Sequence, residues 1–239
     1  MKGGKALEEM GIKFMLGGKE IFIHDTIVNS IIITIGLIIF AFVVNSKIKK
    51  ADPTKKPTGL VNVMEIVYTM VHDLVESTMG KGPTRERLFP YLMTLVLFLP
   101  IANIFGLLGF SPPTSDYNVT LSLALITFVM TQYYGIKTNK LSGYLKGYIE
   151  PVAFLLPLNI VGEISNPISL SFRLFGNILS GGIIMGLLYQ ALGWIAPLLT
   201  PVFHTYFDLF AGFIQTFIFL MLTMVFVGGN LPDEEEAVS

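Results

Sequence analysis

The chain contains no cysteine, and only 14% of its 239 residues are charged. The missing cysteines exclude disulfide bonds and thiolate metal sites. The low charge, together with 52% hydrophobic residues, argues against a soluble domain, because a soluble domain of this size needs more polar residues to cover its surface. The composition therefore predicts an integral membrane protein.

Motifs typical of several enzyme classes are also missing. There is no Gly-rich loop ending in Gly-Lys-Ser/Thr, no Gly-x-Ser-x-Gly elbow and no His-Glu-x-x-His motif. The net charge is −1, and no basic block points to nucleic acid. The polar start of the chain has no short apolar core with a cleavage site, so we expect no removable signal peptide. These absences argue against a catalytic site, a cofactor, a metal site or a nucleic-acid partner.

Long uncharged runs divide the chain into expected membrane crossings. Three runs have the length needed to cross about 30 Å of hydrocarbon, namely 27–44, 89–110 and 119–136. Two longer runs follow, and we expect helices over 151–190 and 195–228. The predicted fold class is an all-α integral membrane protein, with five membrane-crossing helices in a single membrane domain.

An amphipathic stretch between the first two crossings is expected to form a further helix. From 60 to 78, apolar residues recur every three or four positions, and acidic and amide residues fall mainly on the other face. This pattern is typical of a helix that lies along the membrane surface. A soluble helix packed against the other loops would show the same pattern, and this alternative stays open.

Lysine and arginine residues lie beside the crossings on alternate sides. The segment 45–59 holds five lysines, and basic residues also precede the second crossing and follow the third. The loop 111–118 has none. Because loops rich in lysine and arginine stay in the cytoplasm, we expect the tail 1–25 outside the cell and the acidic tail 229–239 in the cytoplasm.

The run 151–190 is too long for an upright helix. As one helix it would extend about 60 Å, twice the thickness of the hydrocarbon. Either Pro157 and Pro167 break it, or it lies steeply tilted and forms a long hairpin with the run 195–228. The tilted hairpin is favoured, because the polar residues of both runs fall at helical spacing.

Each arm of this expected hairpin carries a polar stripe. Six residues of the first arm would share one helical face: Asn159, Glu163, Asn166, Arg173, Asn177 and Ser180. The second arm repeats the pattern with His204, Asp208 and Gln215. Amides and hydroxyls alone would suit hydrogen bonds between helices, worth about 0.6 kcal/mol each. A fixed cation, two acids and a histidine favour an ion pathway, although His204 and Gln215 would also suit a structural role.

Arg173 is the residue that most needs an explanation. A guanidinium at the centre of a membrane helix costs about 2.5 to 3.5 kcal/mol on insertion scales, and it cannot lose its proton. The small residues Gly176, Ser180 and Gly181 follow it and would let another helix come close. This combination suits a surface that meets a partner helix bearing a carboxylate, and that carboxylate is missing from this chain.

At this point the sequence resembles subunit a of bacterial F-type ATP synthases. The resemblance rests on Ser169-Leu170 and the run 172–177, Phe-Arg-Leu-Phe-Gly-Asn, and on the run 213–219, Phe-Ile-Gln-Thr-Phe-Ile-Phe. The order of crossings, the basic loops and the length agree over nearly the whole chain. The resemblance implies a non-catalytic, ion-translocating subunit of the bacterial plasma membrane. Its implied partners are a rotating ring of c subunits, the b-subunit peripheral stalk, the rest of the synthase and the lipid bilayer.

The resemblance also implies roles for individual residues. Arg173 would separate two half-channels and meet the ring carboxylate, with Asn177 and Gln215 lining its pocket. The small residues Gly176, Ser180 and Gly181 would face the ring.

The two half-channels are assigned by the same resemblance. Asp208 and His204 would belong to the outward half-channel, and Glu163 to the inward one. Many relatives carry an ionisable residue where this chain has Gly182, and this departure puts more weight on Asp208 and His204.

Two questions stay open at this level. A ladder of titratable groups suits protons, but sodium-driven members of the family share the arginine, so sodium stays possible as the transported ion. The main alternative function is an ion-coupled secondary transporter with a polar site at the membrane midplane. Such a transporter predicts an internal repeat, and the two halves of this chain show none.

Overall fold

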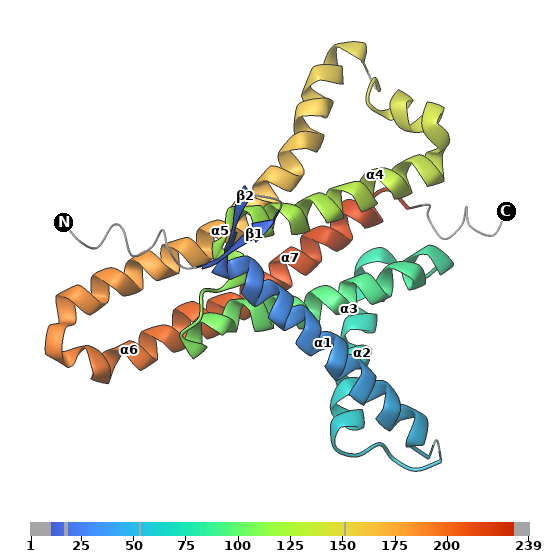
Figure 1. The fold of residues 1–239 in the computed structure, drawn as a ribbon. Helices are drawn as coiled ribbons and strands as arrows, with labels where there is room; N and C mark the ends of the chain where they lie inside the picture. Colours follow the sequence, from blue (N-terminus) through green and yellow to red (C-terminus); the bar gives the residue numbers. More distant parts are fainter. Residues whose placement is uncertain (1–10, 17–18, 53, 151, 232–239) are drawn as a thin grey trace.

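The computed structural model describes residues 11–16, 19–52, 54–150 and 152–231 of the chain. In these ranges the chain is helical apart from short connections and one β-hairpin near its start (Figure 1). The tails expected outside the cell and in the cytoplasm fall partly beyond them, since residues 1–10 and 232–239 lie outside the described residues.

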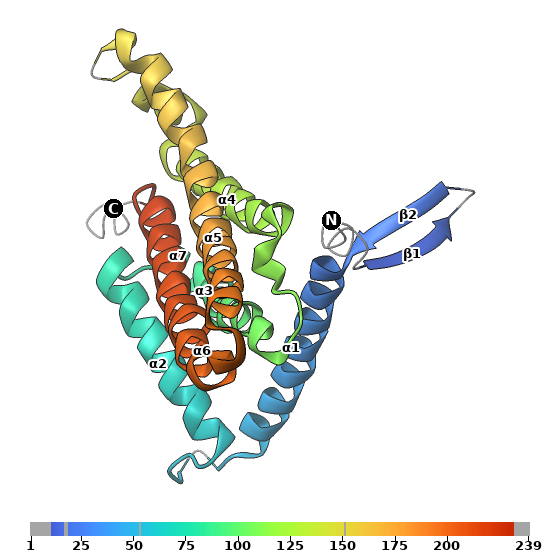
Figure 2. The same cartoon turned by 90° about the vertical axis from the view of Figure 1, so that its left-hand side faces the viewer.

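The β-hairpin consists of β1 (Gly11–Leu16) and β2 (Lys19–His24), which pair antiparallel. Figure 2 shows it projecting beyond the start of α1. The predicted all-α membrane fold is confirmed, although the expectation did not include this short hairpin. The signal was present in the sequence as Gly17-Gly18, because a two-glycine link between apolar runs favours a tight hairpin turn.

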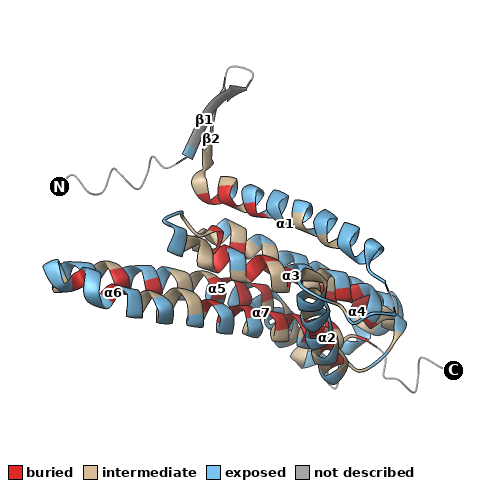
Figure 3. Cartoon of the chain, turned by 90° about the horizontal axis from the view of Figure 1, so that it is seen from below, coloured by how far each residue is buried: buried red, intermediate tan, exposed pale blue. Residues whose placement is uncertain are grey.

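Helix α1 (Asp25–Lys50) follows directly and lies to one side of the other helices. Its first turns are buried at Thr26 and Asn29, and most of the remainder is exposed (Figure 3). The side chain of His24 caps the helix by accepting a hydrogen bond from the backbone N–H of Thr26. An apolar helix of 26 residues with so little protein around it is suited to a lipid environment.

Helix α2 (Leu60–Met79) is flanked by Gly59 and Gly80, both of which have positive φ. Its buried face, with Val71 and Val75, packs against α3 and α7. The amphipathic stretch 60–78 thus lies within one helix, and its position along the membrane surface stays a prediction.

The core of the molecule lies where α3 (Pro83–Ile104), α4 (Tyr117–Gly147) and the C-terminal hairpin meet. Two 3₁₀ turns, Phe105–Leu108 and Pro113–Ser115, join α3 to α4. The largest fully buried apolar side chains come from three helices, α3, α5 and α7: Leu88, Leu92, Leu99, Leu170, Leu174, Phe219 and Met224.

The C-terminal hairpin has two long arms. After a 3₁₀ turn (Ala153–Leu155), α5 (Leu156–Leu192) forms the first arm and continues through Pro167, so the prolines do not break it. A 3₁₀ turn (Gly193–Ile195) reverses the chain, and the second arm comprises α6 (Ala196–His204), a π-helical turn (Thr205–Phe210) and α7 (Ala211–Gly228). At 1.5 Å per residue α5 is about 56 Å long, nearly twice the thickness of about 30 Å that the hydrocarbon of a bilayer has, and its tilt stays a prediction.

Four stretches of the described chain are long and apolar enough to cross a membrane. They are α1, α3 with its 3₁₀ extension (Pro83–Leu108), α4, and the whole hairpin Ala153–Gly228. Since the hairpin has two arms, these stretches correspond to the five expected crossings. The helices are longer than the apolar runs, since α1 and α4 both continue into segments that contain lysines.

Candidate functional site

The two polar stripes meet at one hydrogen bond between the arms of the hairpin. Asn177 of α5 donates through Nδ2 to Oε1 of Gln215 on α7, at 2.5 Å. Gln215 is fully buried, and its Nε2 has no hydrogen-bond partner in the described chain. The structure therefore brings together these two predicted site residues.

A second contact fixes α7 one turn before Gln215. The amide of Asn103 on α3 donates to the backbone carbonyl of Gly212 at 3.1 Å, and Thr114 donates to its Oδ1 at 2.8 Å. A Cβ on Gly212 would lie 3.1 Å from the Cβ of Asn103, so the absence of a side chain allows this approach. Asn103 thus anchors the arm that carries Gln215.

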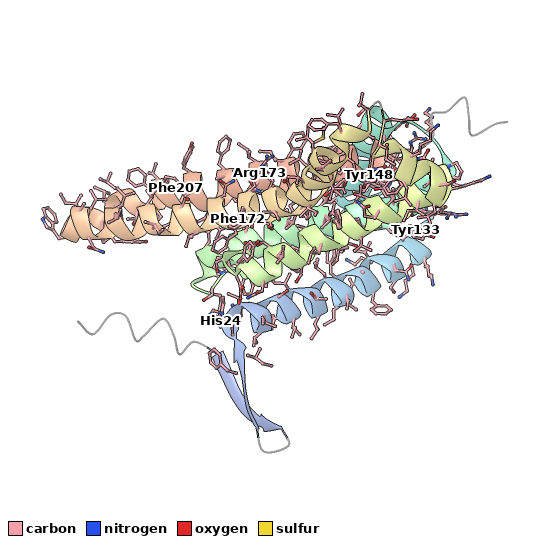
Figure 4. All side chains as sticks on the ribbon, turned by 90° about the horizontal axis from the view of Figure 1, so that it is seen from above. His24, Tyr133, Tyr148, Phe172, Arg173 and Phe207 are labelled. Atoms are coloured by element: carbon pink, nitrogen blue, oxygen red, sulfur yellow. The ribbon has the colours of Figure 1, made fainter. Side chains whose placement is uncertain are left out.

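Arg173 lies one helical turn before Asn177, and its side chain is exposed. In the described part of the chain no hydrogen bond or ion pair holds its guanidinium, and in particular Gln215 does not. The neighbouring Phe172 packs its ring 4.9 Å from that of Tyr117, on the side of α4. Figure 4 shows Arg173 on the opposite edge of the hairpin, away from α1.

The small residues beside Arg173 do not all share its surface. Ser180 is exposed, and a Cβ on Gly176 would meet nothing within 4 Å. Gly181 is buried, and its Cβ would lie 3.8 Å from Phe207 of the other arm. Gly182 has open space around it, so an ionisable side chain would fit there.

His204 and Asp208 form a cluster near the turn of the hairpin. His204 Nδ1 lies 2.5 Å from a carboxylate oxygen of Asp208, and its Nε2 lies 2.6 Å from the hydroxyl of Tyr189 on α5. Asp208 sits in the π-helical turn, and such turns often occur at functional sites. Sequence reasoning predicted His204 and Asp208 but missed Tyr189, although the sequence has this tyrosine near the end of α5.

Glu163 belongs to a separate cluster at the other end of α5. Gln132 of α4 donates through Nε2 to its carboxylate at 3.1 Å. The hydroxyl of Tyr144 donates to Oε1 of Gln132 at 2.7 Å and lies 2.9 Å from the hydroxyl of Tyr148. Sequence reasoning missed all three partners, although Gln132 stands out as an amide near the end of an apolar run.

This cluster borders a wide polar cleft between the end of α4, the start of α5 and the end of α7. Among its lining residues are Tyr144, Tyr148, Asn159, Glu163, Asn166 and Asn230. The lining includes two acids, Glu150 and Glu163, and no lysine or arginine. Asn159, a further predicted stripe residue, donates to the backbone carbonyl of Tyr148 at 2.9 Å.

One group in the described chain brings three potential metal ligands within 4.8 Å of one another, namely His72, Asp73 and Glu76 on α2. His72 also lies 3.4 Å from Glu86 of α3, and Glu76 pairs with Lys81. These contacts account for the group as a link from α2 to Glu86 of α3 and to Lys81 in the connection between the two helices.

The comparisons with known proteins agree on one family. The family model described as ATP synthase A chain matches residues 27–228. The chain is 37% identical to the "ATP synthase subunit a, sodium ion specific" of Propionigenium modestum, over 83% of this chain and 71% of that protein. It is 36% identical to the ATP synthase subunit a of Geobacter sulfurreducens, over 87% and 88%. It is 32% identical to that of Lysinibacillus sphaericus, over 89% and 94%.

Proposed function

The chain belongs to the ATP synthase A chain family, and on this premise we propose that it conducts ions through two half-channels that meet a rotating c-ring at Arg173. It is a multi-pass membrane protein of bacterial type and the non-catalytic, membrane-sector subunit of an F-type ATP synthase, where it takes part in ion translocation. The half-channels, the ring contact and the roles of single residues are the proposal.

The observation that carries the proposal is the arrangement of polar groups along the hairpin. Glu163 lies ten residues before Arg173, and Tyr189 lies sixteen residues after it, which corresponds to about 15 Å and about 24 Å along the helix. The Glu163 cluster and the His204–Asp208 cluster are thus separated, with the exposed Arg173 between them. Two half-channels offset across the membrane require such a separation.

The proposed mechanism depends on the charge of Arg173. A ring carboxylate that faces the guanidinium is stabilised in its ionised form, because opposite charges attract strongly where water is scarce. A carboxylate that has taken up an ion has no such attraction and can turn away into the lipid. An ion therefore crosses only when the ring rotates from one half-channel to the other.

The surface around Arg173 suits a partner helix. Gly176 and Ser180 leave it open, and Gly181 lies behind it, where it lets the other arm approach. We assign the first two to the ring-facing surface. The b-subunit stalk and the rest of the synthase complete the proposed assembly.

The two clusters would serve opposite sides of the membrane. The basic residues near the end of α4 support a cytoplasmic position for the Glu163 cleft, and His204 and Asp208 would then serve the outer side. This orientation puts the N-terminus outside the cell. The contact of His204 with both Asp208 and Tyr189 suits a proton relay, whereas one relative is named as sodium-specific.

The test is ATP-driven ion uptake into vesicles that contain the purified complex. Arg173→Ala should abolish uptake while the subunit remains in the complex at its normal amount. Arg87→Ala, at an exposed position on α3, is the matched control and should leave uptake unchanged. Coupled uptake that survives in the Arg173→Ala complex would refute the proposal. Parallel runs with sodium and with a protonophore identify the ion.

A further inference from the structure

We propose that Gln132 and Tyr144 are positioning residues of the inward half-channel, which hold the Glu163 carboxylate towards the cleft where it exchanges a cation with the cytoplasm. The inference rests on the proposed function and assigns it two further residues. Neither lies on the hairpin that carries the two polar stripes, since both belong to α4.

The orientation of the Gln132 amide is the first step. An amide has an acceptor end and a donor end, and the network of partners decides which end points where. The hydroxyl of Tyr144 donates to Oε1 at 2.7 Å, so the NH₂ group is directed to the opposite side, where it donates to Glu163 at 3.1 Å. Tyr144 therefore acts on Glu163 through Gln132.

The fold of α4 explains how Tyr144 reaches Gln132. Lys140 has φ +56°, a conformation that is uncommon outside glycine, and it makes the helix turn. The segment 141–147 after this turn, here called the α4 end segment, leads back towards the start of α5 (Figure 1). The ring of Tyr144 then lies against Gly135, where an added Cβ would be only 2.5 Å from it.

The backbone at Glu163 offers a second oxygen. Pro167 has no N–H, so the carbonyl of Glu163 loses the hydrogen bond that the residue four positions later normally donates. A small cavity beside it is lined by Glu163, Asn166 and Pro167, and by Thr127 and Thr131 of α4. A hydrated cation that reaches Glu163 would thus find several oxygen atoms.

The charge of the cleft supports a cation as the ligand. Its two acids are Glu163 and Glu150, and Glu150 pairs with Lys146 of the α4 end segment at 3.3 Å. Of the two acids that line the cleft, Glu163 is therefore the one that pairs with no cationic side chain in the described structure. A cation that enters the cleft is attracted towards this carboxylate.

The experiment compares ATP-driven ion uptake by complexes with single and double substitutions. Tyr144→Phe removes only the hydroxyl, and Gln132→Met removes the amide at similar length. Each should lower the uptake rate about fivefold, the usual effect of one hydrogen bond. The double variant should be no slower than Gln132→Met alone, because Tyr144 acts through Gln132. Tyr133→Phe, at an exposed position on the same helix, is the control and should match the wild type.

A labelling measurement separates this role from a general disturbance of the fold. The chain has no cysteine, so Gly162→Cys introduces a single thiol into the cleft, at a position with open space for a side chain. A membrane-impermeant maleimide should label it from the cytoplasmic face equally well with and without Tyr144→Phe. Unequal labelling would show that Tyr144 shapes the cleft and would overturn the positioning role.

Three further outcomes would decide the matter. Wild-type uptake in Tyr144→Phe, or additive losses in the double variant, would overturn this inference and leave the proposed function intact. Wild-type uptake in Glu163→Gln would remove Glu163 from the inward path and would overturn the inference as well. The function proposed for Arg173 is tested separately by Arg173→Ala.

Discussion

Asn177 and Gln215 join the two arms of the hairpin through one hydrogen bond of 2.5 Å, from Nδ2 to Oε1. Gln215 is fully buried, and no other hydrogen bond to its side-chain amide is present in the described chain. A buried amide held at one end by a single bond depends on that bond for its orientation. The pair therefore fixes the register of α5 against α7 beside Arg173.

Asn177→Ala should destabilise the hairpin. The substitution leaves the buried Oε1 of Gln215 without a donor, at a cost of about 1 to 3 kcal/mol. We expect a lower midpoint of thermal helix loss, followed by circular dichroism of the isolated subunit in detergent. The control is Asn62→Ala, an exposed asparagine of α2, which should leave the midpoint unchanged. Equal midpoints in the two variants would contradict the structural role of the pair.

Arg173→Lys should lose coupled ion uptake although it keeps the positive charge. A guanidinium is planar and presents several donors in a fixed fork, whereas an ammonium is a compact point charge that is strongly hydrated. The measurement is ATP-driven uptake by complexes shown to contain the normal amount of the subunit. An uptake rate equal to that of the wild type would mean that charge alone is sufficient.

The hairpin and most of its polar residues could be predicted from the sequence. The helical spacing of the stripes reports directly on which residues share a face, so the approach of Asn177 to Gln215 follows from packing the two faces together. The fold class followed in the same way, because a scarcity of charge and long apolar runs exclude most alternatives. Such signals are local and add up along the chain.

The remainder depends on contacts between distant residues. The π-helical turn at Asp208 widens the helix by the choice of backbone hydrogen bonds, and no composition signal marks it. The turn at Lys140 occurs at a residue with no preference for positive φ, so the position of Tyr144 could not be predicted. The polar partners of Glu163 therefore become visible only in the folded chain.

Asp208→Asn should impair translocation strongly. The carboxylate lies 2.5 Å from Nδ1 of His204, and an amide in its place can neither take up nor release a proton. We expect the uptake rate to fall roughly 10-fold or more, within the range typical of lost proton transfer groups. The control is Asp73→Asn at an exposed position of α2. Equal effects of the two substitutions would remove Asp208 from the pathway.

Asp116 in the loop before α4 would be a poor control for this comparison. Its carboxylate caps α4 by accepting from the backbone N–H of Asn118, and it also accepts a hydrogen bond from the hydroxyl of Thr26 at 2.9 Å. A change at Asp116 would disturb the contact between α1 and the loop. Its effect on uptake would therefore report on folding as well as on transport.

Gly135→Ala should reduce ion uptake without a large loss of stability. A methyl group at this position would lie 2.5 Å from the ring of Tyr144 and 3.0 Å from Oδ1 of Asn230, so at least one of these side chains must move. The ring of Tyr144 belongs to the α4 end segment, whose residues are mostly exposed or half-buried, so the ring can shift outward at little cost. That shift breaks the hydrogen bond to Gln132 and releases Glu163.

The matched control is Gly36→Ala on α1, where an added Cβ meets nothing within 4 Å. Both variants should show thermal midpoints close to that of the wild type, but Gly135→Ala should lose about as much uptake as Tyr144→Phe. A strong fall in the thermal midpoint of Gly135→Ala would mean that the α4 end segment is part of the core and cannot shift to make room for the methyl group. Normal uptake with a normal midpoint would mean that Tyr144 keeps its hydrogen bond despite the methyl group, and that the close approach to Gly135 is not required.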